Sequence, residues 1–281
     1  TQFPTSCCEP TECGSRGDRF ECRYDGTRCL CKTGYASQWD DNECVRTLYV
    51  DGGLTTSQND CPDEPGNDGD CWERAFGDLQ AALDAAQGLI DTDVSVDRVQ
   101  IWVAAGIYKP TRHTETSEPR TKTFVIPSHV ELYGGFEQTG GNRPDHLRDL
   151  STNGWQHRRT ILSGAVDDTN AYHVVTIKEG TTDAIIDGFV ISGGNAIDGT
   201  DTDFTSNGKL KGGGMTIGAG SQVKIRRSAF IGNHAQQGGA LYAYQTASLH
   251  LLNVLFAANL AENGAGALWI DSRHPNGGDT V

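Results

Sequence analysis

The chain has 281 residues, of which 37 are acidic and 23 are basic, so its formal net charge is −14. This balance argues against a nucleic-acid partner, which needs clustered lysines and arginines, and on average it repels acidic polysaccharides. Glycine is abundant, with 35 residues, whereas methionine occurs once, and this usage favours many tight turns over long helices.

All nine cysteines lie within the first 71 residues of the chain. Such a cluster predicts a disulfide framework made in an oxidising compartment, and hence a secreted or cell-surface protein. Zinc is the competing interpretation of the close pair Cys29 and Cys31, but zinc prefers a Cys-x2-Cys spacing with a second matched pair. We therefore expect neither a metal nor another cofactor. Nine is an odd number, so one thiol is free, cross-links to another chain or pairs outside the printed sequence.

The N-terminus shows no signal peptide, and the sequence has no apolar run long enough to span a bilayer. We expect a mature form, or a fragment of a longer protein, from which the export signal has been removed.

Residues 1–46 form the first predicted domain, a small module that contains little apolar material and needs covalent staples. Its order of Cys29-x-Cys31, Gly34-Tyr35 and Cys44 resembles the C-terminal half of an EGF-like module. The resemblance implies the pairs Cys8–Cys22, Cys13–Cys29 and Cys31–Cys44, and it leaves Cys7 as the unpaired or interchain thiol. Cys7 and Cys8 are adjacent and could exchange these roles. The spacing from Cys13 to Cys22 is long for that family. The acidic calcium-binding signature is missing from the sequence before Cys8.

Residues 47–98 are predicted to hold a connecting strand, a polar loop and a helix. Cys61 and Cys71 are expected to close the loop over 57–71. The helix is predicted over 72–87, with Asp70 and Glu73 as a capping box. It is indicated by apolar residues at helical spacing, namely Ala75, Phe76, Leu79, Ala82, Leu83 and Ala86.

From residue 99 onward the apolar pattern has period two, which indicates short strands. The C-terminal part also repeats itself, because Phe230 and Asn233 recur as Phe256 and Asn259, and 259 − 233 = 26. A period of this length means stacked supersecondary units. Each unit holds three short apolar stretches, which predicts an all-β fold, a parallel β-helix with three strands per coil over 99–281.

The recurrent turn residues are expected to shape the coils. Each asparagine is predicted to adopt a left-handed conformation and to bond to its counterpart one coil away, and each glycine pair allows a sharp bend. These structural turn residues are Asn195, Asn233, Asn259, Gly213, Gly239 and Gly266.

The alternating Phe-x-x-Asn and Gly-Gly-Ala-Leu motifs over 186–270 resemble the repeats of chlamydial polymorphic membrane proteins and related Pmp-like bacterial surface proteins. This resemblance implies a right-handed β-helix whose N-terminal end is capped by the helix at 72–87. It also implies a surface-exposed, adhesive role. Residues 271–281 are predicted to form a turn without a cap, so we expect either that the β-helix continues beyond the printed sequence or that another chain covers this end.

The acidic residues offer two weak sites. Asp198, Asp201 and Asp203 lie in an insert over 198–210 and are the calcium candidates, although their loop lacks the glycine and glutamate of an EF-hand. Asp167 and Asp168 are adjacent, and Asp187 precedes Gly188, which is predicted to lie in a turn. Surface turn aspartates are the preferred interpretation of all six.

The sequence therefore predicts a non-catalytic extracellular structural or adhesive protein, or a subunit of an extracellular filament. Its expected partners are other protein chains or extracellular glycans. The alternative is a polysaccharide lyase or hydrolase of pectin-lyase-like fold. That alternative requires Asp167, Asp168 and Asp187 to converge within ~10 Å in one groove beside an arginine.

Overall fold

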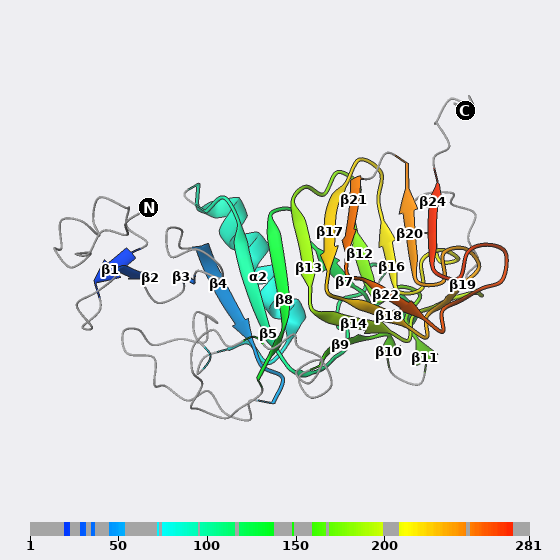
Figure 1. Ribbon diagram of the computed structural model, residues 1–281, viewed down its shortest axis with the longest axis horizontal. Coiled ribbons are helices and arrows are strands. Elements are labelled where there is room, and N and C mark those ends of the chain that lie inside the picture. Colours follow the sequence, from blue (N-terminus) through cyan, green and yellow to red (C-terminus); the bar gives the residue numbers. More distant parts are fainter. Residues whose placement is uncertain are drawn as a thin grey trace.

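The structure is a computed structural model that describes much of the chain. It gives the backbone of residues 20–22, 29–31 and 35–36, and the residues 45–53, 72, 75–94, 96–115, 118–137, 148, 159–166, 169–198, 208–245 and 248–271. The described fold is mostly β, and its strands form parallel sheets. Figure 1 shows parallel strands side by side along the long axis of the molecule, with β4 toward the N-terminal end and β24 toward the C-terminal end.

Sheet I is the longest. It runs in the order β21-β17-β13-β8-β5-β4-β3, and all its pairs are parallel except β3–β4. The strands are β3 (Tyr35–Ala36), β4 (Val45–Val50), β5 (Val99–Ala104), β8 (Val130–Phe136), β13 (Ala184–Asp187), β17 (Gln222–Arg226) and β21 (Ser248–Leu252).

Three further parallel sheets lie beside it. Sheet II consists of β6 (Gly106–Tyr108), β9 (Thr160–Ser163), β14 (Phe189–Ser192), β18 (Ala229–Ile231) and β22 (Leu255–Ala257). Sheet III consists of β15 (Asn195–Ala196), β19 (His234–Ala235) and β23 (Leu260–Ala261). Sheet IV consists of β7 (Phe124–Ile126), β12 (Val175–Ile177), β16 (Met215–Ile217), β20 (Leu241–Tyr244) and β24 (Leu268–Asp271).

Two antiparallel pairs lie outside these sheets. They are β1 (Phe20–Cys22) with β2 (Cys29–Cys31), and β10 (Ala165–Val166) with β11 (Thr169–Asn170).

From β12 onward the chain passes through the sheets in a fixed order, from IV to I to II to III and back to IV. We call one such passage a repeat; β12–β15, β16–β19 and β20–β23 are three successive repeats. The register follows the predicted spacing, since Val223 pairs with Leu249 and Phe230 pairs with Phe256. Each described repeat therefore adds one strand to each sheet.

The sequence predicted three strands in each repeat, whereas the structure has four. The additional strand is the one in sheet III. Its strands have only two residues each, for example His234–Ala235, and each lies beyond a tight turn. They are held by backbone bonds between repeats, such as His234 N–H to Gly194 O at 2.9 Å. Two residues are too few to show a period-two pattern.

The core lies between the sheets. Alternate residues of each strand point inward, as do Val223 and Ile225 of β17 and Met215 and Ile217 of β16. Their fully buried neighbours include Phe124, Phe189 and Phe230. This continuous apolar interior joins the repeats along the whole stack.

The helix α2 (Leu79–Thr92) packs against β4, β5 and β7 at the N-terminal side of the stack, and its inward face joins the same core. It begins later than predicted. Asp78 is the N-cap and its carboxylate accepts from Gln80 N–H at 3.0 Å. Phe76 instead extends the sheet, because its N–H donates to Tyr49 O at 2.8 Å. The proposed capping residues Asp70 and Glu73 lie outside the described residues.

Candidate functional site

A pocket of about 230 Å³ opens beside sheet IV and is lined by residues from four separate segments. Tyr172 and His173 precede β12, Thr176 lies on β12, and Lys209 comes from the segment before β16. The opposite wall consists of Thr114, Glu115 and Thr121, which surround the 3₁₀ helix η2 (Pro119–Thr121).

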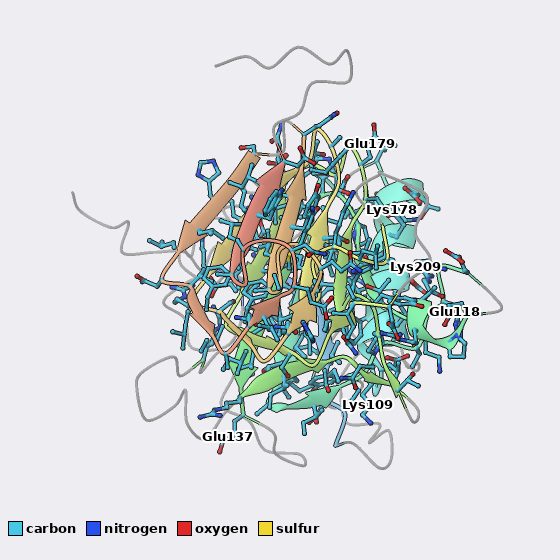
Figure 2. All side chains as sticks on the ribbon, turned by 90° about the vertical axis from the view of Figure 1, so that its right-hand side faces the viewer. Lys109, Glu118, Glu137, Lys178, Glu179 and Lys209 are labelled. Carbon is cyan, nitrogen blue, oxygen red and sulfur yellow. The ribbon has the colours of Figure 1, made fainter. Side chains whose placement is uncertain are left out.

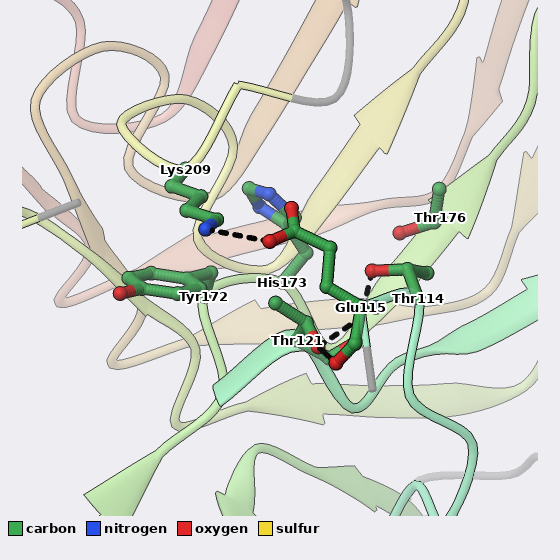
Figure 3. Close-up of a pocket in the computed structure, with 7 residues that line it drawn as sticks. All are labelled: Thr114, Glu115, Thr121, Tyr172, His173, Thr176 and Lys209. Atoms are coloured by element: carbon green, nitrogen blue, oxygen red, sulfur yellow. Dashed lines mark hydrogen bonds and ion pairs between the residues drawn. The ribbon is translucent and has the colours of Figure 1, made fainter. Parts of the chain in front are cut away.

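An ion pair crosses the mouth of this pocket. Lys209 Nζ donates to Glu115 Oε2 at 3.0 Å, and Figure 3 shows the two side chains reaching toward each other above Tyr172. The hydrogen bond to Glu115 raises the pKa of Lys209. Burial raises the pKa of Tyr172. Both shifts favour the protonated forms of Lys209 and Tyr172, that is, an ammonium group and a neutral phenol.

Hydroxyl groups line the rest of the pocket. Thr121 Oγ1 donates to Glu118 O at 2.7 Å, and Thr114 Oγ1 donates to Thr121 O at 3.2 Å. Thr176 Oγ1 shares a hydrogen bond of 2.9 Å with Thr123 Oγ1. Because the protons of Thr114 and Thr121 are already used, the oxygens of these side chains offer mainly acceptor capacity.

Arg120 supports the pocket from behind. Its guanidinium lies over the Tyr172 ring at 4.2 Å from the centroid, and its Nε donates to Asn170 O at 2.9 Å. It also pairs with Asp198, the first of the calcium candidates. A carboxylate already bound to a guanidinium is a poor cation ligand, so this contact argues against the calcium interpretation. Asp201 and Asp203 lie outside the described residues.

Asp187, at the end of β13, is fully buried and binds two arginines. Arg148 Nη2 and Arg227 Nε each donate to its Oδ1 at 2.9 Å, and Arg227 also pairs with Oδ2. Both carboxylate oxygens are thus occupied and neither meets solvent. Asp187 ties strands together and does not face a groove. Asp167 and Asp168 lie outside the described residues, so the predicted carboxylate cluster has only this one described member.

The turn asparagines form a ladder between repeats. Asn233 Nδ2 donates to Asn259 Oδ1 at 3.0 Å, which is the predicted bond between counterparts. Asn233 Oδ1 accepts from Gly194 N–H at 3.0 Å, and Asn259 Oδ1 accepts from Asn233 N–H at 3.0 Å. Each side-chain amide also donates to a carbonyl of the preceding repeat. Asn233 Nδ2 donates to Ile191 O at 2.9 Å, and Asn259 Nδ2 donates to Phe230 O at 2.8 Å.

Two expectations for these asparagines were wrong. Asn195 pairs with His234, so it lies one position after the ladder and Gly194 takes the equivalent place. The asparagines are not left-handed either. The residue immediately before each ladder position carries the positive φ, and these residues are Gly193 at 77°, Gly232 at 65° and Ala258 at 54°. The bend is made by that residue, and the side chain of the next one secures it.

The predicted turn glycines divide into two roles. Gly212 and Gly238, the first members of their pairs, have φ of 60° and 62°. The second members approach neighbouring backbone closely, since a Cβ on Gly213 or Gly239 would lie 2.4 or 2.3 Å from a carbonyl oxygen. A Cβ on Gly266 would lie 2.6 Å from another. Only glycine fits at such contacts.

The last described repeat exposes an apolar surface, which we call the uncovered end. It includes five side chains that are between 37% and 63% exposed: Leu251, Leu252, Leu255, Leu260 and Ile270. Leu251 and Leu255 pair with Ile225 and Ala229 of the preceding repeat, which are completely buried. Within the described chain, β21, β22, β23 and β24 are each the last strand of their sheet, so no strand covers these residues.

The cysteine predictions mostly concern residues beyond the described ones. Cys7, Cys8, Cys13, Cys44, Cys61 and Cys71 lie outside the described part of the chain. The backbone of β1 and β2 places Cys22 opposite Cys29, with Cys31 at the far end of the same pair. The disulfide pairs therefore remain predictions.

Sequence reasoning missed the pocket residues. Glu115 and Lys209 are 94 positions apart and belong to no repeated motif. Arg148 and Arg227 were likewise not connected to Asp187. The only available signal was the pair of basic residues Lys209 and Lys211 at the end of an insert that is rich in Asp, Thr and Gly.

Among the described residues, no group of three or more His, Cys, Asp or Glu side chains is arranged to hold a metal ion. The helices in that part of the chain are all too short or too polar to cross a bilayer. Comparisons with protein-family models, with curated proteins and with solved structures give no match.

Proposed function

We propose that the chain is a non-catalytic extracellular structural or adhesive protein that associates with other protein chains through its uncovered end. The observation that carries this proposal is the set of apolar side chains exposed on β21, β22, β23 and β24, of which Leu251 and Leu255 are in register with fully buried residues of the repeat before them. Burying one leucine or isoleucine contributes about 1.5–3 kcal/mol, so covering this surface is strongly favourable. The partner proposed here is a second copy of the chain, and the competing cover is a further repeat of the same polypeptide, as the sequence analysis expects.

The proposed architecture is a right-handed parallel β-helix of the Pmp-like type. The fixed order of the chain through four parallel sheets supports it, and connections between parallel strands are almost always right-handed. The packing of α2 on β4, β5 and β7 supports its role as the N-terminal cap, because a terminal sheet edge needs cover.

We propose further that residues 1–46 form an EGF-like module, as their cysteine order suggests. The cysteine-rich composition also supports a location outside the cell. Non-reducing peptide mapping by mass spectrometry tests the module. It should find Cys8–Cys22, Cys13–Cys29 and Cys31–Cys44, and any other pairing within this segment contradicts the proposal.

The association is tested by sedimentation and by electron microscopy of the full chain, with and without reductant. Native protein should form stacked assemblies, and the double variant Leu255→Lys/Leu260→Lys should stay monomeric. The control is Val94→Lys, which replaces an exposed apolar residue just after α2 and should assemble normally. A native protein that is monomeric under every condition, or assemblies that tolerate both lysines, would refute the proposal. If reductant alone dissociates the assemblies of the native protein, the contact between chains is a disulfide and not the uncovered end.

A further inference from the structure

The pocket beside sheet IV has a charge arrangement that restricts its ligand. Glu115 and Lys209 face each other at 3.0 Å and neutralise each other. A charged ligand would have to separate the pair and leave one of its members without a counter-ion. A neutral ligand with hydroxyl groups avoids this, because a hydroxyl can donate to the carboxylate and accept from the ammonium at the same time.

The walls of the pocket point to the same chemistry. The hydroxyl protons of Thr114 and Thr121 are used in bonds to backbone carbonyls, so these oxygens can only accept from a ligand. Thr121 Oγ1 already accepts from Glu115 N–H at 3.2 Å and therefore has one lone pair left. Together with the Glu115 carboxylate they make a surface rich in acceptors, with Lys209 as the cationic donor. A ligand that carries several O–H donors on a compact frame matches this surface.

Size and overall charge narrow the choice. A volume of about 230 Å³ lies below the ~300–1,000 Å³ of pockets that enclose drug-sized molecules, and it suits one sugar ring rather than a chain of them. The chain has a net charge of −14, which opposes the approach of acidic sugars.

We propose that this pocket binds a single neutral sugar residue of an extracellular glycan, with its hydroxyls bridging Glu115 and Lys209. The biological meaning of this site depends on the proposed adhesive role, whereas its chemistry depends on the pocket alone. Arg120 acts as a positioning residue, since it holds Tyr172 and the backbone behind the pocket without lining it.

The test is titration of the full chain, followed by NMR, with the methyl glycosides of glucose, galactose, mannose and N-acetylglucosamine. At least one should bind saturably. Glu115→Ala and Lys209→Met should each weaken that binding about tenfold or more, a loss within the range of one charged hydrogen bond. The methyl glycoside of galacturonic acid should bind more weakly than that of galactose.

Matched controls are Glu179→Ala and Lys178→Met, which change the same residue types in the exposed turn after β12 (labelled in Figure 2) and should leave binding unaltered. The proposal is overturned if none of the four neutral glycosides binds, if the two pocket variants bind as well as the unaltered chain, or if the acidic sugar is preferred. Sedimentation of the pocket variants keeps the two proposals apart, because they should assemble normally, whereas the Leu255→Lys/Leu260→Lys variant should still bind sugar.

Discussion

Replacing Asp187 by asparagine should destabilise the protein more than any other single charge removal described above. The carboxylate is fully buried, and it accepts from Arg148 and Arg227. The guanidinium of Arg148 is itself only 7% exposed, so without Asp187 it becomes a buried charge without its counter-ion. Breaking a buried pair by removing one partner typically costs about 3–5 kcal/mol. We expect Asp187→Asn to lower the free energy of unfolding by that amount.

Asp198→Asn provides a matched comparison. This aspartate also pairs with an arginine, Arg120, but its side chain is 62% exposed. Exposed pairs contribute about 0–1 kcal/mol, so the same substitution should have little effect here. Urea denaturation followed by circular dichroism measures both variants, with the slope of the transition as a check that the same surface unfolds. If Asp187→Asn loses no more stability than Asp198→Asn, the two arginines do not depend on the Asp187 carboxylate and the reasoning fails.

Three further predictions use the same denaturation assay. Gly232→Ala should destabilise the chain by about 1 kcal/mol and Ala258→Gly should stabilise it by a similar amount, because both positions have positive φ. If both substitutions change the free energy of unfolding in the same direction, this prediction is wrong. Tyr133 has a raised pKa, caused first by burial and then by the charge of Glu131, so folding favours its protonated form. The stabilisation by protonated Tyr133 is complete below pH ~10 and is lost as the pH rises further. Above pH ~10 the free energy of unfolding should therefore fall by about 1.4 kcal/mol per pH unit, and Tyr133→Phe should remove this dependence. Asn233→Asp should cost at least about 2 kcal/mol, since it turns the donor to a carbonyl into an acceptor; a smaller loss would mean that the ladder is not important for stability.

The repeat register was predictable from the sequence because it depends on local identity. The spacing of 26 that joins Phe230 to Phe256 is also the register of β18 and β22. The helix start was not predictable to the residue, since Phe76 fits the apolar stripe of α2 but forms a bridge to Val50 instead. Periodicity reports which face is buried and does not report what covers that face.

The site was much less accessible to sequence reasoning. Glu115, Lys209 and Tyr172 come from segments that differ between repeats, so no repeated motif marks them. Asn195 was placed on the ladder because it follows a glycine pair, yet the register assigns that place to Gly194. A single-residue shift of this kind is fixed by hydrogen bonds between repeats, which leave no trace in composition.

The Asp187 cluster also has a mechanical consequence. Arg148 lies next to β8, Asp187 ends β13, and Arg227 follows β17, so one carboxylate joins three neighbouring strands of sheet I. Tension along the stack loads the interfaces between repeats in series, and the weakest one opens first. The ionic link crosses two of these interfaces at once. Under tension from the C-terminal side, the last described repeat should therefore detach before the strands around Asp187 separate, and the force should fall in steps.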